Sequence, residues 1–261
     1  MLQKVRVGFF PGYIYMPVRV APDAVIDAGP LSIRIGLAGS ETFTSGPPLP
    51  EASMEAALRA LCEEAAIDLT SRPVCVTESA EQRHGPRAGR ERWVTVLFEC
   101  FSVHSVYLVL QPACALWLTG VTTGLVIDAT HVVPIYENYA LPHAAKNLDE
   151  TVSLAKIAYD SVFTCDCDIW KDLLPHVVLC GRGSEVSETL VATLQRELTA
   201  AVAETHPAIA KVCCVRAADH SEAYAWHGAS TFASFEAGTG QWIRRDDYDV
   251  RGSEIVHQNC A

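Results

Sequence analysis

The sequence predicts an α/β fold, and two observations support that prediction. Short runs rich in Val, Ile and Leu alternate along the chain with segments whose apolar residues recur every three or four positions. Strands that alternate with helices in this way are typical of an α/β architecture. Hydrophobic residues make up 49% of the 261 residues and charged residues 20%, which is the balance of a globular protein with a sizeable core.

The first half of the chain opens on residues 5–20, which are rich in Val, Phe and Tyr and are broken by Pro11 and Gly12. This pattern indicates a hairpin or an extended arm. A loop dense in Gly, Ser, Thr and Pro is expected at residues 39–50. Helices are expected at residues 51–66, 91–101 and 112–118, and strands at residues 24–27, 31–37, 74–77, 106–110, 124–128 and 132–136.

The second half is richer in helical patterns, and the most regular amphipathic helix is expected at residues 187–203. No internal repeat with a period of 20 to 50 residues is visible in the sequence. Further helices are expected at residues 150–163, 169–174 and 226–235, strands at residues 177–180 and 212–215, and short segments at residues 246–248 and 254–257.

The balance of charge is acidic, with 31 Asp and Glu against 20 Lys and Arg and a formal net charge of −11. A nucleic-acid-binding surface needs Lys and Arg to neutralise phosphates, so this class of function is not expected. The basic cluster of the chain consists of Arg83, Arg87, Arg90 and Arg92. We interpret it as a solvated loop in preference to a phosphate site, because Gly and Pro interrupt it.

No stretch reaches the roughly 18 uninterrupted apolar residues of a membrane-spanning helix, so no membrane association is expected. Residues 1–20 contain no continuous apolar region, so no signal peptide is expected either. The 10 cysteines follow no spacing typical of a zinc site. We expect reduced, buried cysteines that pack as small hydrophobic residues.

A long part of the chain resembles the actin family, from residue 24 to residue 261, which leaves residues 1–23 as an extension. The matching segments follow actin's order with few changes. They are residues 97–101, 107–111, 115–117, 119–120, 122–124, 130–137 and 139–143, then residues 165–169, 171–173 and 253–257 with Trp226, Gly228, Ser230 and Cys260.

The resemblance implies an actin-like fold, of the RNase H-like and Hsp70-type ATPase class. Actin has two lobes, each with a large and a small subdomain, and ATP binds in the cleft between the lobes. In this chain both small subdomains are expected to be absent, with residues 39–50 in place of the first. The expected divisions are residues 24–142 for the first large subdomain and residues 143–261 for the second with a C-terminal return segment.

The resemblance also locates a remnant of the nucleotide site. Asp27, Gly29 and Arg34 match the first phosphate loop, with Arg34 in place of a lysine that contacts phosphate. Pro30 and Leu31 replace a small polar residue and a glycine. Proline removes one N–H donor, and leucine places a side chain where the backbone must approach the phosphate, so the loop is expected to be impaired.

The second phosphate loop is missing. The family has a Gly-Asp-Gly turn after its aspartate, whereas Asp128 and Ala129 run straight into Thr130 and His131. A glycine pair that lies near the nucleotide in the family is reduced to Gly181. The segment that supplies the adenosine contacts is expected to be absent as well.

The resemblance assigns roles to the remaining polar residues. Gln111 would position the attacking water and His131 would lie beside it, so these two are the candidate catalytic residues. Asp27 and Asp128 would hold Mg²⁺ through water. Because the loops are incomplete, we expect no bound cofactor, or ATP and Mg²⁺ held weakly.

The expected function is therefore that of a non-catalytic scaffold subunit in a cytoskeletal or chromatin-associated assembly. The alternatives are a reduced actin-like protein with slow ATP hydrolysis and a truncated product with no stable fold. The cytoplasm or cytoskeleton is the expected location, with the nucleus as the alternative.

A candidate partner site follows from the same resemblance. Trp117, Thr231, Phe232 and Phe235 match the cleft between the two large subdomains, where many actin partners insert a helix. Aromatic residues dominate interface energetics, and packing in the core is the alternative role. The expected partners are other proteins, including the end of an actin or actin-like filament.

Overall fold

The structure is a computed structural model that forms two compact units. The first unit consists of Met1–Glu78, Gln82–Val109 and Ala229–Ala261, and the second of Ser79–Glu81 and Leu110–Gly228. These boundaries differ from the predicted subdomain limits. The structure describes residues 2–6, 13–17, 23–29, 32–49, 53–84, 87–128, 131–141, 145–146, 153–181, 186–218, 220, 223–236 and 242–260, with the backbone alone at residues 2–6, 13–17, 81, 84, 145–146, 235 and 236.

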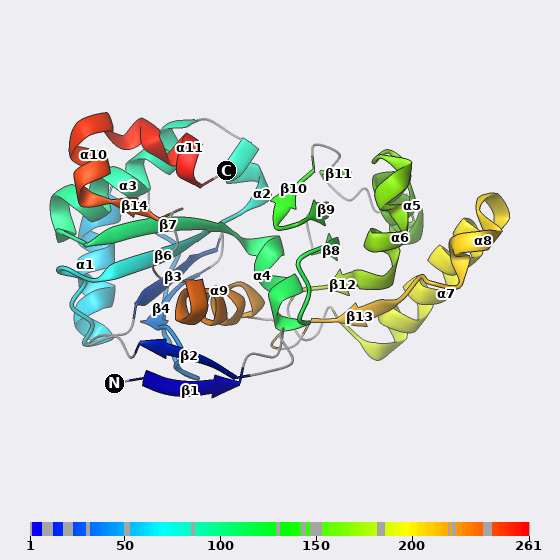
Figure 1. Cartoon of the computed structure of the whole chain (residues 1–261), viewed down its shortest axis with the longest axis horizontal. Coiled ribbons are helices and arrows are strands. Elements are labelled where there is room, and N and C mark those ends of the chain that lie inside the picture. Colours follow the sequence, from blue (N-terminus) through cyan, green and yellow to red (C-terminus); the bar gives the residue numbers. More distant parts are fainter. Residues whose placement is uncertain are drawn as a thin grey trace. The chain divides into compact units, whose positions relative to one another are not determined.

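The first unit is built on a six-stranded sheet with the order β14-β7-β6-β3-β4-β5 (Figure 1). Strand β3 is antiparallel to β4 and parallel to β6, and this register places Asp27 opposite both Arg34 and Thr77. Three polar side chains therefore meet at one point of the sheet. The strands are β3 (Ala24–Ala28), β4 (Ile33–Leu37), β5 (Thr44–Gly46), β6 (Pro73–Glu78), β7 (Ser105–Leu110) and β14 (Ile243–Arg244).

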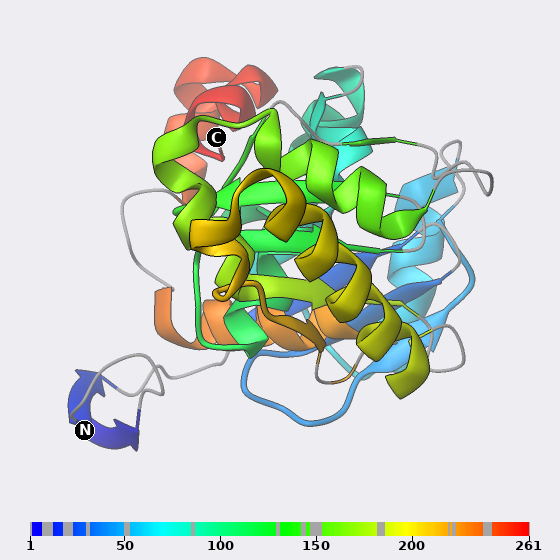
Figure 2. The same cartoon turned by 90° about the vertical axis from the view of Figure 1, so that its right-hand side faces the viewer.

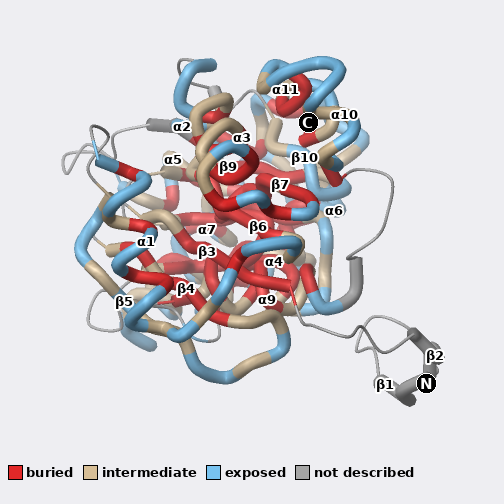
Figure 3. The backbone as a smooth tube through the Cα atoms, turned by 90° about the vertical axis from the view of Figure 1, so that its left-hand side faces the viewer, coloured by how far each residue is buried: buried red, intermediate tan, exposed pale blue. Residues whose placement is uncertain are grey.

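Helices α1 (Met54–Glu64) and α3 (Arg87–Phe101) pack their apolar faces on this sheet, whose strands form the buried interior in Figure 3. Ile255 and Cys260, from far along the chain, belong to the same buried cluster. The first unit also contains α10 (Arg245–Arg251), a short 3-10 turn at Ser253–Ile255, α11 (Val256–Asn259) and the antiparallel hairpin of β1 (Leu2–Arg6) with β2 (Tyr13–Pro17). Helix α2 (Ala80–His84) begins in the second unit and ends in the first.

The second unit holds another sheet, with the order β10-β9-β8-β12-β13 and β11 beside β9. Helices α5 (Leu154–Phe163) and α7 (Glu188–Thr205) pack side by side over one face of it (Figure 2). The remaining elements are α4 (Gln111–Leu118), β8 (Gly124–Ile127), β9 (His131–Tyr136), β10 (Tyr139–Ala140), β11 (Ala145–Lys146), 3-10 turns at Cys167–Ile169 and Leu174–His176, α6 (Trp170–Leu173), β12 (Val177–Leu179), α8 (Pro207–Ala210) and β13 (Val215–Ala217).

Helix α9 (Tyr224–Glu236) begins in the second unit and continues into the first. At Gly228 it packs so closely on α4 that an added Cβ would lie 2.2 Å from the carbonyl oxygen of Cys114. Only glycine fits at that contact. Gly228 is one of the residues that match the actin family, and this close contact with α4 explains why a glycine is needed there.

The two sheets share one topology. In the first, the antiparallel meander β3-β4-β5 is followed by β6 and β7 on the other side of β3. In the second, the meander β8-β9-β10 is followed by β12 and β13 on the other side of β8. The sequence shows no repeat, so this duplication is visible only in the structure.

The α/β prediction is confirmed, and most expected elements form within a few residues of their predicted bounds. The predicted loop at residues 39–50 was wrong in part, because β5 pairs with β4 there. The strand predicted at residues 212–215 starts only at Val215. The Gln195 amide binds the carbonyl of Cys213 and the N–H of Val215, and so occupies backbone groups before and at the start of β13. Among the described residues, no helix is both long and apolar enough to cross a membrane.

Candidate functional site

Asp27 is the first residue of the predicted nucleotide remnant, and both oxygens of its side chain have partners within the first unit. The Oδ2 atom forms an ion pair with Nη1 of Arg34 at 2.7 Å, and Oδ1 accepts a hydrogen bond from the Thr77 hydroxyl at 2.6 Å. Asp27 is only 1% exposed. A buried carboxylate must be paired, and here the neighbouring strands supply the partners.

A backbone hydrogen bond joins the two ends of the segment that follows Asp27. The N–H of Gly29 donates to the carbonyl of Ser32 at 3.0 Å, and a Cβ at Gly29 would lie only 3.1 Å from that oxygen. The guanidinium of Arg34 lies 5.7 Å from the ring centroid of Phe43. Pro30 and Leu31, which carried the prediction of an impaired loop, lie outside the described residues.

Asp128 and His131 close the connection between β8 and β9. The N–H of Asp128 donates to the carbonyl of His131 at 2.9 Å, and the N–H of His131 donates to Oδ1 of Asp128 at 2.7 Å. The His131 ring lies beside the same carboxylate, with Nδ1 3.8 Å from Oδ1. Residues 129 and 130 lie outside the described residues, and the two hydrogen bonds hold the end of β8 against the start of β9.

The other predicted nucleotide residues belong to the second unit. Gln111 is the first residue of α4 and is 8% exposed, and Gly181 follows β12 with a φ of 149°. Burial and the nearby Asp128 carboxylate raise the pKa of the Cys180 thiol well above its usual value. Asp27 and Arg34 belong to the first unit, so the predicted set is divided between the two units.

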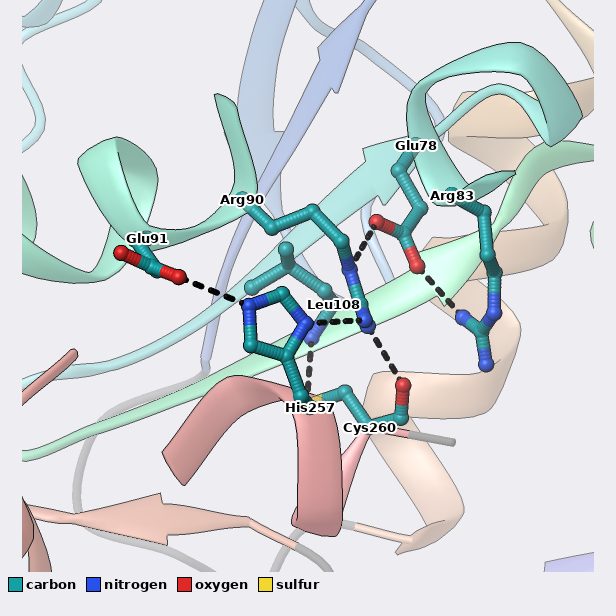
Figure 4. A network of polar contacts seen from close by, with 7 residues as sticks. All are labelled: Glu78, Arg83, Arg90, Glu91, Leu108, His257 and Cys260. Atoms are coloured by element: carbon teal, nitrogen blue, oxygen red, sulfur yellow. Dashed lines mark hydrogen bonds and ion pairs between the residues drawn. The ribbon is translucent and has the colours of Figure 1, made fainter. Parts of the chain in front are cut away.

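Sequence reasoning missed a buried polar network in the first unit (Figure 4). The carboxylate of Glu78 binds Arg83 through one oxygen and Nε of Arg90 at 2.8 Å through the other. The guanidinium of Arg90 continues to the carbonyl of Cys260 and to Nδ1 of His257 at 3.3 Å. This network corrects the interpretation of the basic cluster as a solvated loop, because Arg83 lies on α2 and the 6% exposed Arg90 on α3.

The same network fixes α11 against α3 and β7. Nε2 of His257 lies 2.9 Å from Oε1 of Glu91, and the sulfur of Cys260 accepts a hydrogen bond from the N–H of Leu108 at 3.3 Å. Since Arg90 can only donate, the pairing with Nδ1 favours the tautomer of His257 whose Nε2 carries the proton. Burial raises the pKa of Cys260 to about 11.

Comparison with protein families gives a match to the actin model over residues 51–150 and residues 143–261. The chain belongs to the actin family. Its 261 residues and two mixed sheets form an actin-like fold of reduced size.

The four residues that resemble the actin partner cleft also divide between the units. Trp117 is 9% exposed, and its Nε1 donates to Oδ1 of Asn138 at 2.8 Å. Phe232 is half-buried and stacks on Tyr107 with ring centroids 5.0 Å apart. Thr231 is partly buried on the same helix, α9. The backbone of Phe235 lies in α9, but its side chain lies outside the described residues.

Proposed function

We propose that this actin-family chain is a non-catalytic subunit that docks in a larger protein assembly. The proposal rests on the side chain of Asp27, whose two carboxylate oxygens both have partners within the chain. Its carboxylate is paired with Arg34 at 2.7 Å and with Thr77 at 2.6 Å. Arg34 stands where the family has a phosphate-contacting lysine, so the cation that would meet a phosphate neutralises the carboxylate instead.

The connection between β8 and β9 supports the same proposal. A phosphate clamp needs several backbone N–H groups that point at the anion. Here the N–H groups of Asp128 and His131 are both used inside the turn, at 2.9 and 2.7 Å. The residues in hand therefore fit Mg²⁺-ATP poorly, and we derive no catalytic step through that group.

Calorimetric titration of the full chain with ATP and Mg²⁺ tests the absence of catalysis. We expect no binding, or a dissociation constant far above 1 μM, which corresponds to about −8 kcal/mol. A dissociation constant at or below that level would overturn the proposal and favour the reduced ATPase. In that case Asp27→Ala and Asp128→Ala should each weaken binding, and Gln111→Ala should slow phosphate release.

Docking is tested on the surface that resembles the actin partner cleft. We propose that a partner, an amphipathic helix or the pointed end of an actin-like filament, engages Trp117, Thr231, Phe232 and Phe235. Phe235→Asp should abolish co-purification of that partner, because a desolvated, unpaired carboxylate costs several kcal/mol. Recovery of the same partners by a folded Phe235→Asp variant would assign these residues to packing alone.

A further inference from the structure

A pocket of about 420 Å³ opens in the first unit where helices α1 and α3 end, and Asp27 is not among the residues that line it. Cys62, Leu69 and Phe101 are its buried apolar members. The exposed residues that line the pocket have polar or short side chains. The complete lining consists of Arg59, Cys62, Glu63, Ala66, Ile67, Asp68, Leu69, Thr70, Cys100, Phe101 and Ser102.

Each helix is followed at the pocket by a residue in the left-handed conformation. After α1, the N–H of Ile67 donates to the carbonyl of Cys62 at 2.9 Å, with Ala66 at a φ of 53°. After α3, the N–H of Val103 reaches the carbonyl of Leu97 at 3.4 Å, with Ser102 at a φ of 51°. Glycine usually occupies this left-handed position, so two C-termini are built here with residues that adopt it less readily.

Two helix C-termini give the pocket a negative potential, because each carries about half a negative charge in its free carbonyls. Arg59 offsets part of it, since Nη2 donates to the carbonyl of Cys100 at 2.7 Å. The charge of Arg59 is already matched, because its Nε binds Oε1 of Glu55 at 3.0 Å. Hydrogen bonds from Arg59 and the Cys100 thiol hold the pKa of Glu55 below its usual value.

Two further carboxylates lie at the rim. Hydrogen bonds from the backbone and side chain of Thr70 hold the pKa of Asp68 below its usual value, so this group is ionised at neutral pH. Glu63 is exposed, and no ion pair joins its carboxylate to another described residue. A further cation, Arg72, donates its Nε to the carbonyl of Asp68 at 2.9 Å, and its charge offsets part of that of the Asp68 carboxylate. The charge that remains at the rim is negative.

We propose that this pocket receives one basic side chain, lysine or arginine, presented by a partner protein. Its apolar residues Cys62 and Leu69, beside the Phe101 ring over which the Arg59 guanidinium lies at 4.8 Å, suit the hydrocarbon stem of such a side chain. The carboxylates and helix carbonyls suit the cationic tip. The net charge of −11 also draws basic protein surfaces toward the chain. This site is independent of the partner cleft in the proposed function.

The test uses the full ¹⁵N-labelled chain and short peptides observed by NMR. A capped Gly-Ser-Lys-Ser-Gly peptide and its arginine counterpart should shift the amides of residues 62–70 and 100–102 in a saturable way. The peptide with norleucine, which keeps the stem and lacks the charge, should bind at least tenfold more weakly. Equal binding of norleucine, or shifts confined to other residues, would overturn the proposal.

Variants separate this site from general attraction to an acidic protein. The double variant Glu63→Gln, Asp68→Asn should weaken binding of the lysine peptide at least tenfold. Both changes keep a hydrogen-bonding oxygen, so we expect the fold to be preserved. The matched control is Glu64→Gln, an exposed acid next in sequence that does not line the pocket, and it should bind as the wild type does. Equal weakening by the control would overturn the proposal. Binding of butylammonium without binding of either peptide would also overturn it, and would assign the pocket to a free amine.

Discussion

Replacing Arg90 by methionine should destabilise the first unit strongly. The side chains of Arg90 and Glu78 are 7% and 3% exposed, so the change leaves a buried carboxylate with Arg83 as its remaining partner. It also leaves the carbonyl of Cys260 without its donor. Breaking one side of a buried ion pair costs about 3–5 kcal/mol, and Arg83 should hold the loss near the lower end, about 3 kcal/mol.

The measurement is urea unfolding of the wild type, Arg90→Met, Glu78→Leu and the double variant, followed by circular dichroism. The double variant should be more stable than the sum of the single losses predicts, because it removes both charges together. Arg87→Met, on an exposed position of the same helix, is the control and should stay within about 0.5 kcal/mol of the wild type. A loss below about 1 kcal/mol in Arg90→Met would refute the reasoning.

Three further predictions follow from other parts of the chain. Gly228→Ala should lower stability by about 1–3 kcal/mol or more in thermal unfolding, since its Cβ would meet the Cys114 carbonyl at 2.2 Å, whereas Gly89→Ala, with open space around it, should not. Cys260 has a pKa of about 11, so the folded chain resists thiolate formation. The contribution of the Cys260 thiol to the free energy of unfolding is complete below pH 9 and is lost as the pH rises toward 11. The loss amounts to about 1.4 kcal/mol per pH unit, and Cys260→Ala should reduce this dependence of stability on pH. The purified chain should not form filaments, because the surfaces that receive a next subunit are expected to be absent; a filament pellet in polymerising salt, seen by electron microscopy, would contradict this.

Local sequence patterns were enough for the fold class and for most elements. The helix predicted at residues 187–203 formed at Glu188–Thr205 because its apolar residues recur regularly and Ser187 caps its start by accepting a hydrogen bond from the N–H of Leu190. The family followed from long residue-by-residue matches, which one family model confirms. Burial of a charge could not be predicted in this way.

Two of the missed contacts join residues far apart in the sequence. Arg90 binds the carbonyl of Cys260 across 170 positions, and Thr77 binds Asp27 across 50. The arginine cluster was interpreted as solvated because the sequence does not show that the Glu78 side chain is buried beside Arg83 and Arg90. The shared topology of the two sheets was missed for a related reason, because hydrogen-bond order can persist where side-chain identity does not.

The discontinuous make-up of the first unit constrains the order in which the chain can fold during synthesis. Strand β14 pairs Ile243 with Val106, and Cys260 contacts Leu108, so the sheet and core of this unit stay incomplete until residues 243–260 have left the ribosome. The second unit is almost one continuous segment, Leu110–Gly228, and can form earlier. Until then, the edge of β7 that β14 covers stays open, and Arg90 lacks its contacts with His257 and Cys260. An open strand edge on a half-built domain is a site where a nascent chain can aggregate.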